Sequence, residues 1–400
     1  MSRPQENVSR TGSQQRTLVG ILGLLRPHWT DPNFPGRLDK LLSGDRRLGS
    51  RDRRFYRELA YTAVRYLPWV DPLLDTEPSE AVRRIAWLAS DVAGMDEFRA
   101  DMSAGLPPCP AGAAQRAALL GCDAALLTPD WMRGECPSIG EAPLRDILLS
   151  RAPLWLRLQT DDPAPVFREF TAKGLPWKQS GLLKDAVEMP AGTDVSRTAA
   201  YLDGKVEVQD IGSQRVLHEV SLKPGGHWLD ACAGAGGKAL QLALLLGAEG
   251  RVVARDSRKA ALDELSLRAA RAGIGRRISV GGTSDPRDGF DGVLVDAPCS
   301  GSGTWRRSPH LKWSISPQGV RDAASLQLRL LRENAPRVRA GGLLVFATCS
   351  LFTSENAALV DAFLKEAGPF TAEVRGTSLL PQDHDGDGFF VASFRRTDQS

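Results

Sequence analysis

Residues 290–313 read FDGVLVDAPCSGSGTWRRSPHLKW, an apolar run of strand length followed by a small polar turn that contains Cys299. Residues 341–356 read GGLLVFATCSLFTSEN and repeat this pattern, with Cys349 in the turn. Ligands of open α/β sheets bind at the carboxyl ends of parallel strands. The two stretches therefore predict two cysteines that face one cleft. The alternative is structural, because a lone cysteine at a strand end is commonly a small buried apolar residue.

Strands and helices alternate around these two stretches from residue 226 onward, which is typical of a parallel, doubly wound sheet. Apolar runs predict strands at residues 227–231, 251–254, 278–280, 292–295 and 343–347. Helical periodicity predicts helices at residues 238–246, 259–272, 317–338 and 354–366. The closing stretch DGFFVASFRR, residues 387–396, alternates in character and predicts an antiparallel edge strand.

A cofactor site is predicted where WLDACAGAGGK, residues 228–238, forms a strand, a small-residue turn and a helix start. Glycines in such a turn let a ligand approach the backbone. Asp256 ends the next strand, 20 residues after Gly236, where an acidic residue binds ribose hydroxyls in dinucleotide folds. Neither a GxGxxG turn nor a phosphate loop is present, which favours S-adenosylmethionine over a pyrophosphate ligand. The alternative is a tight loop beside a solvated Asp256.

The motif DAPCSG, residues 296–301, and the motif ATCS, residues 347–350, resemble the two cysteine motifs of RNA cytosine-5 methyltransferases. The whole chain resembles the RsmB type within the RsmB/NOP/NSUN family. This resemblance implies a class I, Rossmann-like methyltransferase domain in an α/β chain. It also implies methylation of carbon 5 of a cytosine in RNA, most directly in 16S rRNA of the small subunit.

The resemblance assigns catalysis to Cys349, Cys299 and Asp296. Carbon 5 of cytosine is a poor nucleophile, and thiolate attack on carbon 6 activates it through a covalent adduct. By resemblance, Cys349 is this nucleophile, Cys299 assists product release, and Asp296 contacts N3 and the amino group of the base. Because a free thiol has a pKa of about 8.5, the site must favour the thiolate.

The remaining site residues are assigned in two groups. The resemblance places the cofactor against Asp230, Cys232, Ala233, Gly234, Ala235, Gly236, Gly237, Lys238, Asp256 and Asp296. Members of the family carry Ala-Pro at the positions of Gly234 and Ala235, and an aspartate at the end of the third strand, where this chain has residues 280–283 followed by Asp285. Interleaved basic and aromatic residues predict contact with a flipped base and its phosphates at Arg306, Arg307, His310, Lys312 and Trp313. The alternative for that loop is an exposed segment with one buried tryptophan.

Residues 15–125 carry helical periodicity and predict a helical bundle. One helix is expected to begin at a Ser50 cap, and another to cover residues 81–95. Residues 49–74 resemble NusB-like RNA-binding domains. Residues 1–75 carry 13 Lys and Arg against 8 Asp and Glu, a net charge of +5, whereas the whole chain carries +3. We therefore expect Arg53 and Arg54 to bind RNA phosphates, the alternative being a solvated helix face.

Changes in amino-acid composition along the chain indicate where its parts begin and end. Pro- and Gly-rich residues 105–112 and the sequence TPDW at 128–131 place a boundary near residue 130. Residues 153–158, PLWLRL, predict a strand, residues 166–174 a helix and residues 204–210 a second strand. The expected parts are a flexible tail (1–14), a NusB-like helical domain (15–130), a small α+β linker module (131–222) and the methyltransferase domain (223–400).

Several classes of function are disfavoured. No apolar run reaches the length of a membrane span, and the N-terminus has no apolar signal region, so a cytoplasmic monomer is expected. The six cysteines form no CxxC pair, so neither a metal site nor a disulfide framework is indicated. RNA is the expected partner. The alternatives are a tRNA cytosine-5 methyltransferase and a non-catalytic RNA-binding assembly factor, and the presence of both cysteines disfavours the latter.

Overall fold

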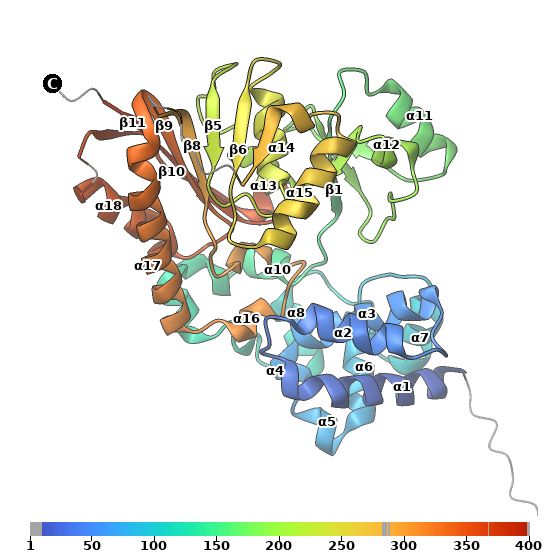
Figure 1. The fold of residues 1–400 in the computed structure, drawn as a ribbon. Helices are drawn as coiled ribbons and strands as arrows, with labels where there is room; N and C mark the ends of the chain where they lie inside the picture. The colour runs from blue at the N-terminus through green and yellow to red at the C-terminus, as the bar shows by residue number, and fades with distance from the viewer. Residues whose placement is uncertain (1–9, 282–285, 287–288, 367, 398–400) are drawn as a thin grey trace, which may run out of the picture. The chain divides into compact units, whose positions relative to one another are not determined.

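The computed structural model describes residues 10–281, 286, 289–366 and 368–397, and the chain forms two compact units (Figure 1). The helical unit comprises Met1–Arg151 and Trp305–Ser316, and the sheet unit comprises Ala152–Thr304 and Pro317–Ser400. The helical unit thus extends beyond residue 130, and the linker and methyltransferase segments share one unit. Of the expected tail, residues 10–14 begin a helix, and residues 1–9 lie outside the described residues.

The helices in residues 10–151 of the helical unit are α1 (Arg10–Leu25), α2 (Phe34–Gly44), α3 (Ser50–Arg65), α4 (Leu67–Val70), α5 (Leu73–Thr76), α6 (Pro78–Leu88), α7 (Met95–Met102), α8 (Ala113–Leu120), α9 (Asp130–Glu135) and α10 (Leu144–Leu148). Buried residues of α1–α4 and α6–α8, with Leu149 after α10, form one apolar core. Gly49, not Ser50, caps α3, and the Asp52 carboxylate accepts a hydrogen bond from the Gly49 N–H at 2.9 Å. The single helix expected over residues 81–95 is wrong, because α6 ends at Leu88 and Gly94 adopts a φ of +87° before α7 begins.

The segment Trp305–Ser316 belongs to the helical unit although both flanking segments belong to the sheet unit. Its short helix α16 (Leu311–Ser314) carries Trp313, whose indole Nε1–H donates to the Val64 carbonyl of α3 at 2.7 Å. The ring of His310 stacks on Phe34 of α2 with 5.7 Å between centroids. This segment therefore contributes to the packing of the helical unit.

The main sheet has the strand order β10-β11-β9-β8-β5-β6-β7 (Figure 1). Its strands are β5 (His227–Asp230), β6 (Arg251–Ala254), β7 (Ile278–Val280), β8 (Phe290–Asp296), β9 (Val338–Thr348), β10 (Phe370–Leu379) and β11 (Phe389–Arg396). Strands β5 to β9 pair in parallel, as the sequence predicts for a Rossmann-like methyltransferase fold. Strand β11 is antiparallel, as predicted, but it is not an edge, because it pairs with both β9 and β10.

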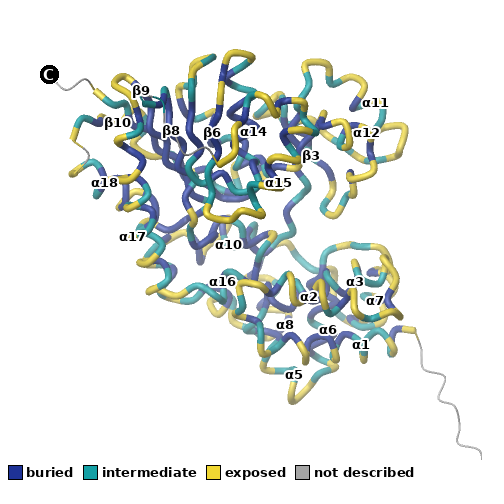
Figure 2. The backbone as a smooth tube through the Cα atoms, viewed as in Figure 1, coloured by how far each residue is buried: buried dark blue, intermediate teal, exposed yellow. Residues whose placement is uncertain are grey.

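Helices cover both faces of the main sheet. One apolar cluster joins the strands to α13 (Ile211–Val216), α14 (Gly237–Leu245) and α15 (Lys259–Arg271). A second cluster joins the alternate strand residues to α17 (Pro317–Asn334) and α18 (Ala357–Glu366). The central strands are consequently buried on both sides (Figure 2), which explains their continuous apolar sequences.

A small antiparallel sheet with the order β2-β3-β1-β4 packs in the same unit. Its strands are β1 (Leu154–Leu158), β2 (Lys178–Gln179), β3 (Ala186–Met189) and β4 (Val206–Val208), accompanied by α11 (Ala164–Ala172) and α12 (Ala199–Leu202). The sequence predicts β1, α11 and β4, and it misses β2 and β3. Strand β1 lies between β3 and β4, so it is the central strand of this sheet.

Candidate active site

The two cysteines leave neighbouring parallel strands at the same edge of the main sheet. Strands β8 and β9 pair with Asp296 opposite Ala347, and the N–H of Ala297 donates to the Ala347 carbonyl at 2.9 Å. The sulfur atoms of Cys299 and Cys349 lie 3.2 Å apart, and both side chains are partly exposed. The structure thus brings the two thiols together where a substrate has access to them.

A glycine allows the two cysteine loops to approach. The N–H of Gly303 donates to the Cys349 carbonyl at 2.9 Å, and the Gly388 N–H donates to the Gly303 carbonyl at 2.8 Å. A Cβ atom on Gly303 would lie 2.1 Å from the Gly388 carbonyl oxygen. Any side chain at this position would therefore push the Cys299 loop away from the Cys349 loop.

The buried carboxylate of Glu355 ties the two loops together. It accepts hydrogen bonds from the Ser300 N–H at 2.8 Å, from the hydroxyls of Ser300 and Ser350, and from the Gln327 amide at 3.0 Å. Ser300 follows Cys299 and Ser350 follows Cys349, so one fully buried side chain fixes the backbone beside each thiol. The sequence shows Glu355 near the second motif, but its contacts with the first loop and with α17 become visible only in the fold.

Asn356 completes this anchor on the Cys349 side. Its amide Nδ2 donates to the Ser350 carbonyl at 2.8 Å, and its Oδ1 accepts from the Thr348 hydroxyl at 2.7 Å. The Ser302 hydroxyl accepts from the Leu351 N–H at 2.8 Å. The loop positions are therefore set by hydrogen bonds to small polar side chains, which sequence reasoning did not single out.

Asp296 is held by a buried lysine. The ammonium of Lys238 lies 2.9 Å from Asp296 Oδ2 and also donates to the Ser213 hydroxyl at 3.1 Å. Lys238 packs over the Phe389 ring, with its nitrogen 4.6 Å from the ring centroid. This pairing orients the Asp296 carboxylate at the end of β8.

Asp230, at the end of β5, is fully buried. The Cys232 N–H donates to its Oδ1 at 3.3 Å, and no donor within the described residues reaches its Oδ2. Burial, with a further contribution from the charge of Asp296, raises the pKa of Asp230 to about 8. An unpaired buried acceptor is costly, so this atom is suited to a donor or a cation supplied by a ligand.

Two thiols of the site, Cys299 and Cys232, have raised pKa values. The hydrogen bond with Cys349, followed by burial, raises the pKa of Cys299 above its usual range. Burial, together with the charges of Asp230 and Asp296, raises the pKa of Cys232 to about 12. Cys232 therefore remains a thiol near neutral pH and is unsuited to nucleophilic attack.

The small-residue turn after β5 is shaped for a ligand. Gly236 caps α14 with a φ of +93°, and the Gly234 N–H donates to Asp256 Oδ2 at 2.8 Å. Partial burial opposes ionisation of Asp256, but hydrogen bonds from Arg258 and Gly234 prevail, and its pKa lies below the usual range. Arg258 pairs with Asp256 Oδ1 at 3.0 Å, and its side chain is 71% exposed.

The loop residues predicted to contact RNA mostly lie inside the helical unit. Arg306, His310 and Lys312 are at most 5% exposed, whereas Arg307 is exposed. Arg306 Nη2 donates to the Arg151 carbonyl at 3.2 Å, and Trp313 donates to α3 as described above. Direct contact with a phosphate from this loop therefore rests on Arg307.

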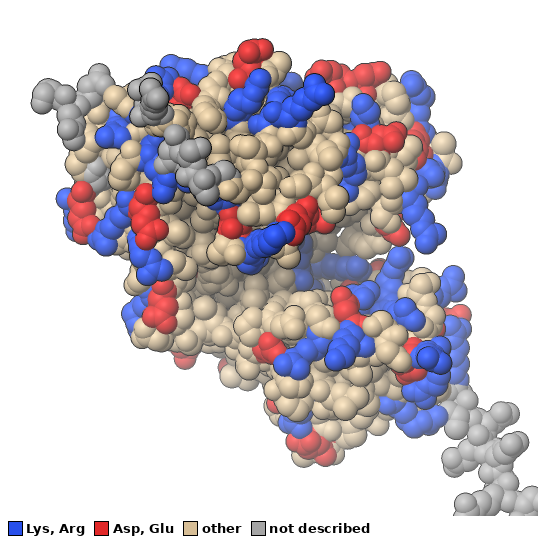
Figure 3. All heavy atoms as spheres, in the orientation of Figure 1, with Lys and Arg blue, Asp and Glu red and all other residues tan. Residues whose placement is uncertain are grey.

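The two basic residues predicted on α3 have different surroundings. Arg53 is partly exposed, and its Nε–H donates to the Leu48 carbonyl at 3.1 Å. Arg54 is exposed. Figure 3 shows Lys and Arg side chains on the surface of the helical unit, and the exposed basic residues at and just before the start of α3 are Arg46, Arg47, Arg51 and Arg54. Asp285, next to the expected third-strand position, lies outside the described residues.

None of the described helices has the length and apolar character needed to cross a membrane. Within the same residues, no group of three or more His, Cys, Asp or Glu side chains is placed to hold a metal ion.

Comparisons with known proteins agree with the fold. Residues 218–395 match the family model described as 16S rRNA methyltransferase RsmB/F. The chain is 33% identical over 259 residues to "Probable ribosomal RNA small subunit methyltransferase B" of Bacillus subtilis, an alignment covering 59% of this chain and 57% of that protein. The chain therefore spans less than two thirds of that relative.

Two solved structures share the fold. The crystal structure of PH0851 has a TM-score of 0.72 at 20% identity, and the match covers 98% of this chain and 99% of the other. The structure of NSun6 from Pyrococcus horikoshii, solved with SFG, has a TM-score of 0.61 at 16% identity and covers 68% of this chain and 99% of the other. At these identities the likeness concerns the fold alone.

Proposed function

Because residues 218–395 belong to the 16S rRNA methyltransferase RsmB/F family, we propose that this protein transfers a methyl group from S-adenosylmethionine to carbon 5 of a cytosine in small-subunit rRNA. The observation that carries the proposal is the pair of thiols 3.2 Å apart at the ends of two parallel strands. Covalent catalysis on a pyrimidine needs one thiol to attack and a second group to accept a proton. Asp296, held by Lys238, adds a carboxylate beside the thiols.

The turn after β5 and the end of β6 fit S-adenosylmethionine. The Asp256 carboxylate suits the ribose hydroxyls, and the buried Asp230 Oδ2, without a donor in the described residues, suits the amino acid portion of the cofactor. NSun6, which shares this fold, was solved with SFG, an analogue of S-adenosylmethionine. The cofactor supplies an electrophilic methyl group. Asp230, Cys232, Ala233, Gly234, Ala235, Gly236, Gly237, Lys238, Asp256 and Asp296 are the residues proposed around it.

Asp256→Ala is expected to weaken S-adenosylmethionine binding while the protein remains folded. The loss of two ribose hydrogen bonds, one of them charge-assisted, costs about 2–4 kcal/mol. Isothermal calorimetry measures the affinity, and Asp263→Ala on the exposed face of α15 provides a control that removes a carboxylate from outside the site. Unchanged affinity in a folded Asp256→Ala protein would exclude this carboxylate from the cofactor site.

The proposed reaction begins with attack of the Cys349 thiolate on carbon 6 of cytosine. A sulfur–carbon bond forms, and the electrons of the 5,6 double bond become available at carbon 5. Asp296 stabilises the adduct by hydrogen bonding at N3 and the amino group. After carbon 5 has gained the methyl group, Cys299 removes the proton from carbon 5, the double bond re-forms, and the Cys349 thiolate leaves.

The short distance between the thiols supports this division of labour. While Cys349 holds a negative charge or a hydrogen bond, Cys299 retains its proton, because both effects raise its pKa. Once the sulfur of Cys349 is bonded to carbon 6, it no longer carries a charge. The largest cause of the raised pKa of Cys299 is then removed, which lowers that pKa although burial still raises it, and Cys299 is proposed to release its proton to solvent and act as the base.

The helical unit is proposed to contribute affinity for RNA but no chemistry. Its exposed basic residues at and just before the start of α3 supply cations for phosphate contact, and Arg307 lies in the segment that packs into the same unit. Arg54 and Arg307 are the exposed members of the predicted set. Phosphate contacts supply sequence-independent affinity, so the choice of cytosine would reside elsewhere.

Charge reversal at Arg53 and Arg54 is expected to lower RNA affinity and to flatten its dependence on salt. Each lost phosphate contact reduces the slope of log affinity against log salt by about 0.7–0.9. A matched control reverses Lys173 and Lys365 in the sheet unit, which changes the net charge by the same amount. Fluorescence anisotropy with a small-subunit rRNA fragment measures the slope. If both pairs leave the slope unchanged, the basic run is a solvated helix face.

The proposal is tested by incubating the protein with S-adenosylmethionine and unmodified small-subunit rRNA, followed by bisulfite sequencing. A single protected cytosine in the rRNA is the expected result. Protection in tRNA instead would identify a tRNA methyltransferase. RNA binding without protected cytosine in either RNA would identify a non-catalytic assembly factor.

A further inference from the structure

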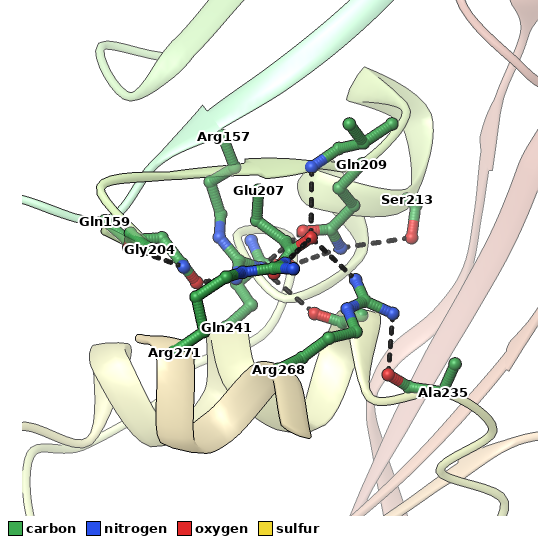
Figure 4. A network of polar contacts seen from close by, with 12 residues as sticks. Arg157, Gln159, Gly204, Glu207, Gln209, Ser213, Ala235, Gln241, Arg268 and Arg271 are labelled. Atoms are coloured by element: carbon green, nitrogen blue, oxygen red, sulfur yellow. Dashed lines mark hydrogen bonds and ion pairs between the residues drawn. The ribbon is translucent and has the colours of Figure 1, made fainter. Parts of the chain in front are cut away.

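A buried polar network connects the small sheet to the turn after β5 (Figure 4). Glu207 of β4 is 2% exposed, and its carboxylate pairs with Arg268 at 3.2 Å and with Arg271 at 3.0 Å. Both arginines lie on α15, which covers the main sheet. One carboxylate of the small sheet therefore fixes two side chains of a helix in the methyltransferase segment.

Arg268 reaches from this carboxylate to the proposed cofactor turn. Its Nη2 pairs with Glu207, and its Nη1 donates to the Ala235 carbonyl at 2.6 Å. The planar guanidinium holds the two contacts in a fixed geometry. Arg271 pairs with the same carboxylate, but it packs on the ring of Tyr201, 4.2 Å from the centroid, rather than on the turn.

A second arginine holds the next part of the turn. Arg157 of β1 is opposite Glu207 in the sheet register, and its Nη1 donates to the Gly237 carbonyl at 3.0 Å. Burial lowers the pKa of Arg157 to about 9, the carboxylate of Glu207 acting in the opposite direction. Contacts from the small sheet thus reach carbonyls on both sides of Gly236, directly through Arg157 and by way of Arg268.

The close approach of the small sheet to α15 depends on a glycine. Gly204 has a φ of +64°, and a Cβ atom there would lie 2.3 Å from the Arg271 carbonyl oxygen. The Gly204 carbonyl accepts from Gln159, whose side-chain oxygen accepts from Arg157 at 2.6 Å. The network is therefore built into the backbone packing and does not consist of surface ion pairs.

We propose that Arg268, oriented by Glu207 of the small sheet, is a positioning residue that sets the shape of the cofactor turn and thereby the affinity for S-adenosylmethionine. The Asp256 carboxylate holds the same turn from its other side through Gly234. Two adjacent residues of the turn are thus held by side chains of opposite charge. The Ala235 carbonyl accepts from the Arg268 cation, and the Gly234 N–H donates to the Asp256 carboxylate. This inference rests on one part of the proposed function, the binding of S-adenosylmethionine at this turn.

Arg268→Ala is expected to raise the dissociation constant for S-adenosylmethionine about tenfold or more, because a charge-assisted hydrogen bond to the turn is lost. Arg271→Ala is the matched control, since it removes a second partner of Glu207 without touching the turn, and its dissociation constant should stay within about twofold. Glu207→Gln should weaken binding in the same direction as Arg268→Ala, and Arg268→Lys should restore part of the affinity.

The readout is calorimetry with S-adenosylmethionine alone, together with steady-state methylation kinetics and thermal unfolding of each variant. A positioning role raises the KM for the cofactor and leaves the KM for RNA and the kcat at saturating cofactor near the wild-type values. Equal weakening by Arg268→Ala and Arg271→Ala would overturn the proposal, because it would reflect a general loss of packing. Wild-type affinity in Arg268→Ala would overturn it as well.

The same measurements separate this proposal from the proposed function. If the wild-type protein binds S-adenosylmethionine but methylates no RNA, the proposed function is refuted. The role of Arg268 is then still tested by calorimetry. If the wild-type protein does not bind S-adenosylmethionine, both the proposed function and the proposed role of Arg268 are refuted. If Arg268→Ala fails to fold, Arg268→Lys and Glu207→Gln decide the question, and wild-type affinity in both would overturn the proposal.

Discussion

Cys349→Ala is expected to abolish methyl transfer, with a loss on the order of 10⁴-fold or more, because it removes the proposed nucleophile for carbon 6, whereas the neighbouring thiol of Cys299 is the proposed base. Asp296 and Lys238 are engaged with each other, and the thiol of Cys232 retains its proton near neutral pH. Incorporation of labelled methyl groups into small-subunit rRNA measures the loss. Denaturing electrophoresis of the same mixture should show no covalent RNA–protein species.

Cys299→Ala should fail in a different way. The adduct forms and the methyl group is transferred, but the proton on carbon 5 has no thiolate to accept it, so release of Cys349 slows. A methylated RNA–protein species that survives denaturing electrophoresis should accumulate. The double variant should behave like Cys349→Ala, since trapping requires the first bond.

A thiol outside the site serves as the control for both variants. Cys136 lies in the helical unit beside Ser138, and Cys136→Ala should retain activity and trap no RNA. Trapping by Cys349→Ala rather than by Cys299→Ala would exchange the two roles. Full activity in both single variants would return the two cysteines to a structural role.

Glu355→Ala is expected to lower the free energy of unfolding by about 3 kcal/mol or more and to reduce methylation by at least about 100-fold. The substitution leaves the buried Ser300 N–H, two serine hydroxyls and the Gln327 amide without their common acceptor. Both cysteine loops then lose the contact that fixes their separation. Chemical denaturation measures the stability, and labelled methyl transfer measures the activity.

Glu366→Ala is the matched control for Glu355→Ala. Both glutamates lie near α18, but Glu366 is exposed and pairs with Arg332 on the surface. Exposed ion pairs contribute about 0–1 kcal/mol, so this variant should differ little from the wild type. If Glu355→Ala unfolds and loses activity no more than Glu366→Ala does, the anchor between the loops is not needed.

The parallel strands were predictable because both of their faces are buried. Residues 227–231, 251–254 and 292–295 form short, mainly apolar runs, and β5, β6 and β8 occupy these positions. Strand β10 was missed for the opposite reason. Its pairing with β11 shifts register between Ala372 and Val374 and again between Val374 and Thr377, which breaks the period of two that identifies a strand.

The candidate site was predictable in its motifs but not in its supports. The apolar run before each cysteine motif placed Cys299 and Cys349 at strand ends, and the structure puts them in contact. Glu207 and Arg268 lie 61 residues apart in sequence, and no local pattern pairs a β-strand glutamate with a helix arginine. Their contact follows from tertiary packing, which local sequence periodicity does not predict.

The basic residues after Cys299 also show that a sequence pattern does not determine tertiary contacts. Composition predicts phosphate contact for Arg306 and Lys312, but the structure buries both, with Lys312 approaching the Arg65 carbonyl at 3.5 Å. Burial, followed by the nearby charge of Arg65, lowers the pKa of Lys312 to about 7. The sequence pattern does not distinguish a basic side chain that donates to backbone carbonyls from one that binds phosphates.

The return of Trp305–Ser316 into the helical unit has a consequence for protein synthesis. Trp313 and His310 pack against helices that the ribosome completes long before these residues are made. The apolar core formed by residues 18–149 is therefore synthesised first, and the contacts of Trp313 and His310 with α3 and α2 form only after the chain beyond the first cysteine loop has left the ribosome. A cut between Arg151 and Ala152 would leave the C-terminal fragment holding a segment whose packing partners lie in the other fragment.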